Sequence, residues 1–283
     1  SEKSNSPADK SAKDEPSRLG FESLPLLPNL LSNLATLGYA TMTPIQAQSL
    51  PFILAGRDVI GQGKTGSGKT AAFGLALLNK LQVKRFRIQS MVLCPTRELA
   101  DQVAKEIRNL ARAIHNIKVL TLCGGTPFGP QIGSLEHGAH IIVGTPGRIE
   151  EHVIKGTLIL DDLNLLILDE ADRMLEMGFE AALDNIIERT PLERQTLLFS
   201  ATFPKQIQEI SENIMTDPVM VKVAASEEPS SISQQFFHVE NDAERFEALR
   251  LLLLANPVES AVVFCNTKKE TQAVCNSLFD DGF

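Results

Sequence analysis

Short apolar runs alternate with segments of helical periodicity along most of this chain. Helical stretches of roughly ten to fifteen residues separate most of the runs. Continuous apolar strands are typical of a parallel sheet that helices cover on both faces. The pattern therefore predicts an α/β fold with strands at 57–61, 89–94, 117–122, 140–143, 164–168, 195–199 and 219–223.

Two segments break this rhythm. Residues 1–18 contain no large apolar side chain, so nothing offsets the entropy of ordering them, and we expect a disordered tail. Residues 224–233, AASEEPSSIS, show no periodicity and predict an exposed linker. The two segments delimit a first domain at 19–223.

A second unit is predicted at 234–283. It begins with the run QQFFHVE, followed by a helix over about 242–255, a strand SAVVFC at 260–265 and a helix from about 267. Two βα units are fewer than an open parallel sheet normally needs, so we expect this domain to be truncated.

The charge is acidic overall but segregated along the chain. A net charge of −8 argues against binding nucleic acid or a membrane by bulk attraction. Between Lys80 and Lys118 there are nine Lys or Arg against three Asp or Glu, whereas Asp161 to Thr190 carries nine acids and two bases. A polyanion would have to meet the local basic surface, although two solvated helix faces of opposite sign would give the same pattern.

Cysteine spacing and hydropathy indicate in which cellular compartment the protein resides. Cys94, Cys123, Cys265 and Cys275 form no C-x-x-C pair, and no apolar run approaches 18 residues. We expect a cytoplasmic protein that makes no contact with membranes.

A glycine-rich loop follows the first predicted strand. Gly63, Gly68, Lys69 and Thr70 satisfy G-x-x-x-x-G-K-[ST], and a helical segment follows. Backbone N–H groups of such a loop converge on phosphate oxygens, so we assign phosphate binding to Gly66, Ser67, Gly68, Lys69 and Thr70. The Thr70 hydroxyl would also bind Mg²⁺. A plain glycine-rich turn is the alternative.

The run LLILDEAD at 165–172 delivers two carboxylates to the carboxyl end of a predicted strand. We assign Asp169 to Mg²⁺, through water, and Glu170 to the general base that accepts a proton from an attacking water. Acids that merely favour a helix N-terminus are the alternative.

Seven ordered motifs together resemble the DEAD-box RNA helicases. The likeness extends from about Phe21 to the end and, in finer detail, is closest to the bacterial DbpA branch, whose members act on ribosomal RNA. It implies a RecA-like P-loop NTPase domain followed by the start of a second RecA-like domain. The motifs are GYATMTPIQ (38–46), TGSGKT (65–70), PTRELA (95–100), GG (124–125), TPGR (145–148), DEAD (169–172) and SAT (200–202).

The resemblance implies roles for residues that have plainer explanations. Gln46 would bind adenine, and Phe21, 17 positions before Gly38, would cover the adenine ring. The alternative for Thr43 to Gln46 is a capping box at the start of the following helix. Single-stranded RNA would bind through its backbone and 2′-OH groups, although Thr145 and Pro146 are also good helix-start residues. The implied RNA contacts are Pro95, Thr96, Arg97, Gly124, Gly125, Thr145, Pro146, Gly147 and Arg148.

Ser200 and Thr202 are expected to hydrogen-bond toward Asp172 and so to couple the ATP state to the RNA surface; a polar strand-end turn is the alternative. Gly61 and Gly63 stand where the family commonly has Ala, which predicts a small loss of loop rigidity.

Together these features predict an ATP hydrolase coupled to local unwinding of short RNA duplexes in ribosomal RNA maturation or ribosome assembly. ATP and Mg²⁺ are the expected cofactors, RNA but not DNA the partner, and a monomer the expected state. The alternative is a nucleotide-dependent RNA clamp or assembly factor that does not unwind. Because the chain lacks the arginines that the second helicase domain brings across the cleft, we expect weak ATP binding, poor hydrolysis and little RNA stimulation.

Overall fold

The computed structural model describes residues 19–223, 233, 235–256 and 260–283. The described residues fall into two compact units, one on each side of the predicted linker. The predicted tail at 1–18 lies outside the described residues, as does the predicted linker apart from Ser233.

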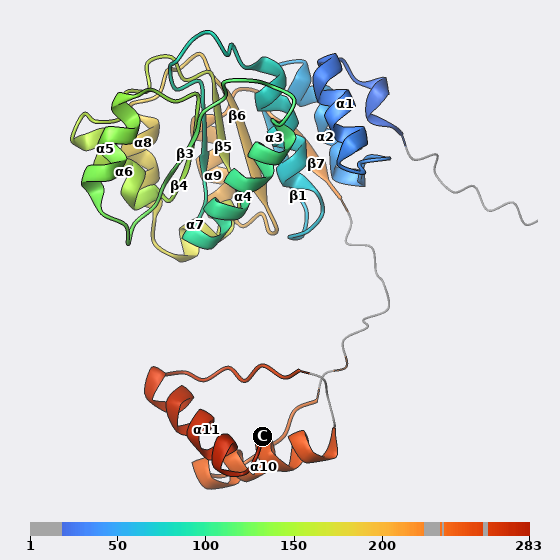
Figure 1. Cartoon of the computed structure of the whole chain (residues 1–283), viewed down its shortest axis with the longest axis vertical. Coiled ribbons are helices and arrows are strands. Elements are labelled where there is room, and N and C mark those ends of the chain that lie inside the picture. The colour runs from blue at the N-terminus through green and yellow to red at the C-terminus, as the bar shows by residue number, and fades with distance from the viewer. Residues whose placement is uncertain (1–18, 224–232, 234, 257–259) are drawn as a thin grey trace, which may run out of the picture. The chain divides into compact units, whose positions relative to one another are not determined.

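Unit 1 is built on one parallel sheet of seven strands in the order β3-β4-β2-β5-β6-β1-β7 (Figure 1). Each of the seven predicted apolar runs overlaps one strand, and every neighbouring pair is parallel, which confirms the predicted α/β class. The strands are β1 (Val59–Gln62), β2 (Ser90–Leu93), β3 (Val119–Leu122), β4 (Ile141–Gly144), β5 (Leu165–Leu168), β6 (Gln195–Ser200) and β7 (Val219–Lys222).

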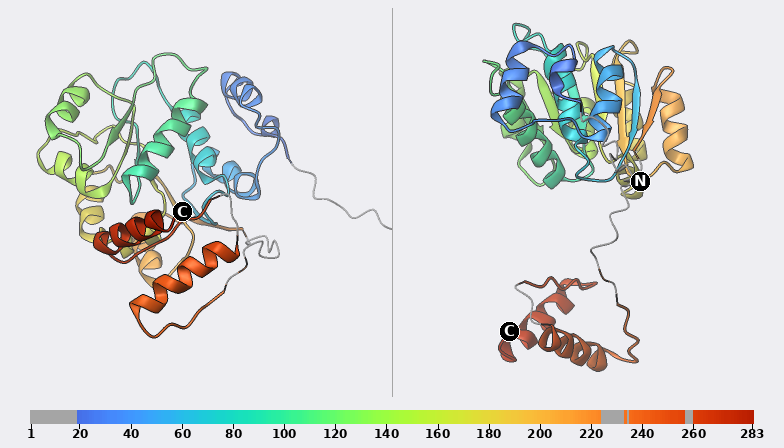
Figure 2. Two further views of the ribbon diagram at one scale, coloured as in Figure 1. Left: turned by 60° about the horizontal axis from the view of Figure 1, so that its bottom comes forward. Right: turned by 90° about the vertical axis from the view of Figure 1, so that its right-hand side faces the viewer.

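Helices cover both faces of this sheet, as the right-hand panel of Figure 2 shows. Buried side chains of α1 to α4 form one core and those of α6 to α9 form the other. A 3-10 helix, Phe21–Ser23, precedes α1 (Pro28–Thr36), α2 (Pro44–Leu54), α3 (Lys69–Lys80), α4 (Arg97–Leu110), α5 (Phe128–Glu136), α6 (Pro146–Ile154), α7 (Ala171–Glu176), α8 (Glu180–Ile187) and α9 (Lys205–Ile214).

The alternation of side chains along β5 explains why its sequence is apolar at every position. Leu165 and Ile167 belong to the first core, whereas Leu166 and Leu168 belong to the second. Successive strand residues point to opposite faces, and both faces are covered here. A central strand of this kind holds the residues that follow it, Asp169 and Glu170, at a fixed place on the sheet edge.

Unit 2 contains the two predicted helices, α10 (Asp242–Ala255) and α11 (Lys268–Asp280). The predicted strand at 260–265 is wrong, and no strand occurs among the described residues of this unit, including 235–240. A strand needs a hydrogen-bonded neighbour, and the described residues of the unit provide none. Val262 and Phe264 consequently remain 78% and 93% exposed.

Candidate functional site: a nucleotide loop and three polar loops on one sheet edge

Six of the seven sequence motifs lie at the carboxyl ends of strands of unit 1, whereas the motif at 38–46 precedes β1. Residues 63–70, 169–172 and 201–202 follow β1, β5 and β6, and residues 95–97, 124–125 and 145–148 follow β2, β3 and β4; several of these segments run into the first turn of the next helix. Carboxyl ends of parallel strands share one edge, where ligands of such sheets collect. The strand order further divides this edge, because β3, β4 and β2 are neighbours, and so are β5, β6 and β1.

The phosphate loop ends at Gly68, the N-cap of α3. Gly68 has φ of 93°, in the left-handed region that favours glycine. A Cβ there would lie 2.6 Å from Gln46 Nε2 and 2.8 Å from Thr43 Oγ1, so the close approach of α2 also requires glycine. Lys69 is buried, and its Nζ donates to the carbonyl oxygen of Gly63 at 2.9 Å.

Gln46 connects the start of α2 to this loop. Its Nε2 donates to the Gly68 carbonyl oxygen at 3.1 Å, and its Oε1 accepts the Thr43 backbone N–H at 2.9 Å. Thr43 and Gln46 form the expected capping box. Within the described part of the chain, Thr43 Oγ1 and Ser67 Oγ are buried beside the loop without a hydrogen bond of normal geometry.

Two carboxylates lie where β5 ends. Asp169 is 2% exposed, and burial is the main cause that raises its pKa to about 6; nearby Lys69 lowers it and Glu170 raises it. Glu170 has φ of 52°, uncommon for a residue with a side chain, and its Oε1 accepts the Thr65 hydroxyl at 3.1 Å. The oxygens of Asp169 and Thr70 are the donor types that Mg²⁺ prefers.

Asp172 is bonded to the loop after β6. Its Oδ2 accepts the backbone N–H and the hydroxyl of Thr202, at 2.9 and 2.8 Å, and its backbone N–H donates to Ser200 Oγ at 3.2 Å. Burial raises the pKa of Asp172, but hydrogen bonds from Thr202, Ser200 and the Arg173 backbone N–H together outweigh burial and lower this pKa. The structure therefore brings together the three residues expected to pair.

The predicted RNA contacts lie on the other half of the edge. Thr96 is the N-cap of α4 and accepts the Leu99 backbone N–H at 3.3 Å, while Thr145 is the N-cap of α6. A Cβ on Gly125, whose φ is 75°, would lie 2.2 Å from Arg97 Nη1, so two of the motifs touch. Arg97, Gly125 and Gly147 are exposed, whereas Pro95, Thr145 and Pro146 are buried.

Arg148 is held by several groups. Its Nη1 donates to the Thr126 carbonyl oxygen at 3.0 Å and to Gln131 Oε1 at 2.8 Å, and its Nε lies 3.1 Å from Glu151 Oε2. Only 11% of its side chain is exposed. Sequence reasoning identified Arg148 but not Gln131, because no motif or spacing marks an isolated amide on a short helix.

Phe21 packs beside Tyr39. Phe21 is 3% exposed, and its ring meets Tyr39 edge-on at 6.2 Å. It lines a hollow of about 410 Å³ together with Glu22, Leu31, Leu34, Ala35, Gly38, Tyr39 and Ala40. The expected adenine role of Phe21 therefore stays a prediction.

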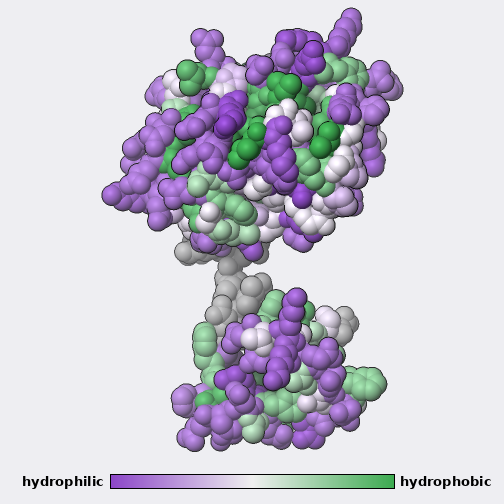
Figure 3. All heavy atoms as spheres, turned by 90° about the vertical axis from the view of Figure 1, so that its left-hand side faces the viewer, coloured by the Kyte–Doolittle hydropathy of each residue, from purple (hydrophilic) through white to green (hydrophobic). Residues whose placement is uncertain are grey.

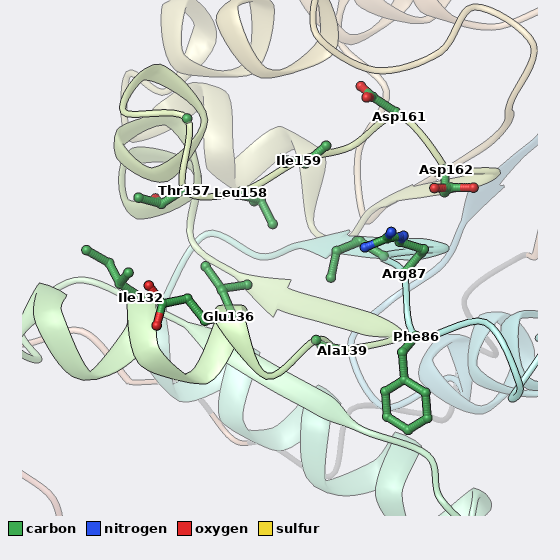
Figure 4. A pocket seen from close by; sticks show the side chains of 14 residues that line it. Phe86, Arg87, Ile132, Glu136, Ala139, Thr157, Leu158, Ile159, Asp161 and Asp162 are labelled. Atoms are coloured by element: carbon green, nitrogen blue, oxygen red, sulfur yellow. The ribbon is translucent and has the colours of Figure 1, made fainter.

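A larger pocket, of about 600 Å³, lies at the opposite end of the strands (Figure 4). Residues 86–88, 138–139 and 156–162 line it and precede β2, β4 and β5. None of the predicted site residues lines this pocket. Pocket volume alone therefore does not identify the site that the sequence motifs predict.

Among the described residues, no helix combines the length and the apolar character that crossing a bilayer requires. The face of unit 1 seen in Figure 3 is mainly hydrophilic, with small hydrophobic areas between the polar side chains.

Comparisons with known proteins identify the family of the chain. A family model described as DEAD/DEAH box helicase matches residues 43–210. The chain is 55% identical over 263 residues to the ATP-dependent RNA helicase DbpA of Escherichia coli, covering 93% of this chain and 57% of that protein. It is 42% identical over 258 residues to the DEAD-box ATP-dependent RNA helicase CshA of Geobacillus kaustophilus, covering 91% and 55%. The chain thus spans just over half the length of these curated relatives.

Solved structures of DEAD-box proteins also resemble this chain. A DEAD box protein of Methanococcus jannaschii matches with a TM-score of 0.70 and 39% identity, over 93% of this chain and 71% of that one. Saccharomyces cerevisiae Dbp5, solved bound to RNA and ADP BeF3, matches with a TM-score of 0.80 and 28% identity, over 93% and 67%. The family model covers more than half of the sequence, and the motif loops share one sheet edge. The chain therefore belongs to the DEAD/DEAH box helicase family.

Proposed function

We propose that this chain binds ATP with Mg²⁺ and the backbone of single-stranded RNA, and that the two together drive local unwinding of short RNA duplexes. The observation that carries the proposal is the division of the sheet edge. The predicted nucleotide residues follow β1 and β5, the predicted coupling residues lie at the end of β6, and the predicted RNA contacts follow β3, β4 and β2. Two ligands can therefore bind side by side.

The nucleotide half has the groups that a triphosphate needs. Glycine backbone, the N-terminus of α3 and the Lys69 ammonium supply positive potential. Mg²⁺, held by Asp169 and Thr70, would neutralise charge on the phosphates. Glu170, fixed by Thr65, is placed to accept a proton from the attacking water.

The RNA half is suited to a sugar–phosphate backbone. Exposed Arg97 adds charge beside Gly125, and the starts of α4 and α6 present backbone N–H groups. No aromatic ring is presented there for base stacking by the residues of the three motifs. We therefore propose binding with little sequence preference.

The finer parts of the proposal rest on the sequence resemblance. The DbpA-like motifs support ribosomal RNA as the substrate and a role in ribosome assembly. The free thiols of Cys94, Cys123, Cys265 and Cys275 fit the reducing cytoplasm. A monomer is the proposed state.

Titration with a fluorescent ATP analogue and Mg²⁺ tests the nucleotide half. Lys69→Ala should weaken binding at least about tenfold, since a charge-assisted contact is lost. Lys64→Ala removes an exposed lysine of the same loop and should leave the affinity unchanged. Equal affinities of the two variants would refute the assignment.

Binding of labelled single-stranded RNA tests the other half. Arg97→Ala should weaken binding and reduce the slope of log K against log salt by about 0.7, the contribution of one phosphate contact. An unchanged slope would refute the RNA half. A strand-displacement assay separates unwinding from the clamp function, which predicts ATP-dependent binding without displacement.

A further inference from the structure

One side chain on α5 is bonded to two of the loops on the RNA half. Gln131 Nε2 donates to the Cys123 carbonyl oxygen at 3.1 Å and to Thr126 Oγ1 at 2.7 Å, both in the loop after β3. Its Oε1 accepts Arg148 Nη1 at 2.8 Å and is 2.8 Å from His152 Nε2, both on α6. Its two donors and its acceptor oxygen are all used, which is the full capacity of an amide.

These partners fix the orientation of the amide and the proton on His152. Arg148 can only donate, so Oε1 must face it, and His152 must then carry its proton on Nε2 to share that oxygen. His152 Nδ1 lies 2.8 Å from Thr157 Oγ1, whose hydroxyl also donates to the His152 carbonyl oxygen at 3.1 Å. The His152 side chain is fully buried and stacks on the Phe128 ring at 4.1 Å, so it cannot turn away.

Three sets of hydrogen bonds hold the loop between β3 and α5. Thr126 Oγ1 donates to the Cys123 carbonyl oxygen at 3.0 Å, Arg148 donates to the Thr126 carbonyl oxygen, and Gln131 contacts both ends. Gly124 and Gly125 lie inside this closed turn. A loop rich in glycine has little stiffness of its own, so its shape depends on such bonds.

From this geometry we infer that Gln131 is a positioning residue for RNA binding, which holds Gly124, Gly125 and Arg148 in one fixed arrangement. The inference rests on the proposed RNA function of those three residues. Gln131 bonds Arg148 directly and reaches the two glycines through their neighbours Cys123 and Thr126, whereas the groups proposed to bind phosphate are backbone N–H groups and the Arg148 guanidinium. Preorganising them lowers the cost of binding a backbone.

The inference is tested with the whole chain, a labelled oligouridylate of about ten nucleotides and varied salt. Gln131→Met keeps the length of the side chain and removes all four bonds. We expect about three- to tenfold weaker RNA binding, as hydrogen bonds of this kind contribute, with unchanged affinity for an ATP analogue. The matched control is Gln208→Met, which removes an exposed amide on α9 that bonds only Glu212.

Three readouts separate positioning from a loss of structure. Gln131→Met should reduce the salt slope by up to about 0.7 although the residue is uncharged, because Arg148 no longer meets its phosphate. Arg148→Met should reduce the slope equally, and the double variant should lose less affinity than the two single losses combined, because part of the effect of Gln131 acts through Arg148. His152→Phe keeps the ring on Phe128 but loses the bond to Gln131, and should weaken binding about two- to threefold.

The failures of the inference and of the proposed function are distinguishable. If Arg148→Met weakens RNA binding while Gln131→Met and His152→Phe do not, the positioning role is overturned and RNA binding stands. Additive losses in the double variant, or weaker ATP binding in Gln131→Met, also overturn it. If Arg148→Met and Arg97→Ala both bind RNA as the unaltered chain does, the proposed RNA surface itself fails.

Discussion

Thr202 donates two hydrogen bonds to one oxygen of Asp172, from its backbone N–H at 2.9 Å and from its hydroxyl at 2.8 Å. Asp172 lies in the first turn of α7, just after Asp169 and Glu170 at the end of β5, and Thr202 follows β6. The pair therefore connects the carboxylates of the nucleotide half to the neighbouring strand end.

Removing the Thr202 hydroxyl should weaken the coupling between the two ligands. In Thr202→Val we expect ATP-analogue affinity within about twofold, whereas the factor by which the analogue strengthens RNA binding should fall about fivefold. Four equilibrium titrations, each ligand with and without the other, measure that factor. Thr36→Val, at an exposed hydroxyl on α1, is the control, and coupling equal to that of the unaltered chain would disprove the connection.

Gln46→Glu should weaken ATP binding about tenfold. The substitution keeps an oxygen for the Thr43 N–H but places a carboxylate against the Gly68 carbonyl oxygen and loses the amide donor. Gln48→Glu puts the same charge on an exposed position of α2 and should bind normally. If the two variants bind the ATP analogue equally well, Gln46 serves only as a capping residue.

Gly61 and Gly63 should differ sharply in their tolerance of alanine. A Cβ on Gly61 would lie 2.5 Å from the buried Phe199 ring, whereas one on Gly63 would meet Ser67 Oγ at 3.2 Å. Gly61→Ala should lower the free energy of unfolding by about 1–3 kcal/mol, and Gly63→Ala by less than about 1 kcal/mol. Urea denaturation measures both; a stable Gly61→Ala would show that Phe199 has room to move.

The buried His152 should make unit 1 less stable at acid pH. Burial is the main cause that lowers its pKa to about 4, Arg148 and Lys155 lower it further, and Glu151 opposes them. Between pH 6.5 and 4 the unfolded chain binds a proton on this imidazole and the folded chain does not, so stability falls as pH falls. The free energy of unfolding contributed by this difference in pKa falls by about 3 kcal/mol between pH 7 and pH 4.

Urea denaturation at pH 7 and pH 4 measures this contribution. His152→Phe has no imidazole to protonate, so the loss of stability between the two pH values should be smaller in the variant by up to about 3 kcal/mol. The same loss in both proteins would show that His152 does not cause the acid sensitivity.

Local sequence signals predicted the features that depend on local chemistry. Apolar runs located all seven strands of unit 1, and the glycine pattern located the loop that ends at Gly68. The strand at 260–265 was wrong because strand formation depends on a hydrogen-bonded neighbour, which an apolar run does not reveal. The sequence analysis did not identify Gln131, because its side chain bonds Arg148 and His152, which lie 17 and 21 positions away in the sequence. Only the folded chain brings these three residues together.

Hydrogen exchange of the whole chain, with each ligand in turn, tests the central claim that ATP and RNA occupy neighbouring halves of one sheet edge. We predict that ATP analogue with Mg²⁺ protects backbone amides at 63–70 and 169–172, and that single-stranded RNA protects those at 95–97, 124–126 and 145–148. Residues 156–162, at the opposite end of the strands, should exchange unchanged with either ligand. Protection by RNA at 156–162, with none at the three loops after β2, β3 and β4, would contradict the account.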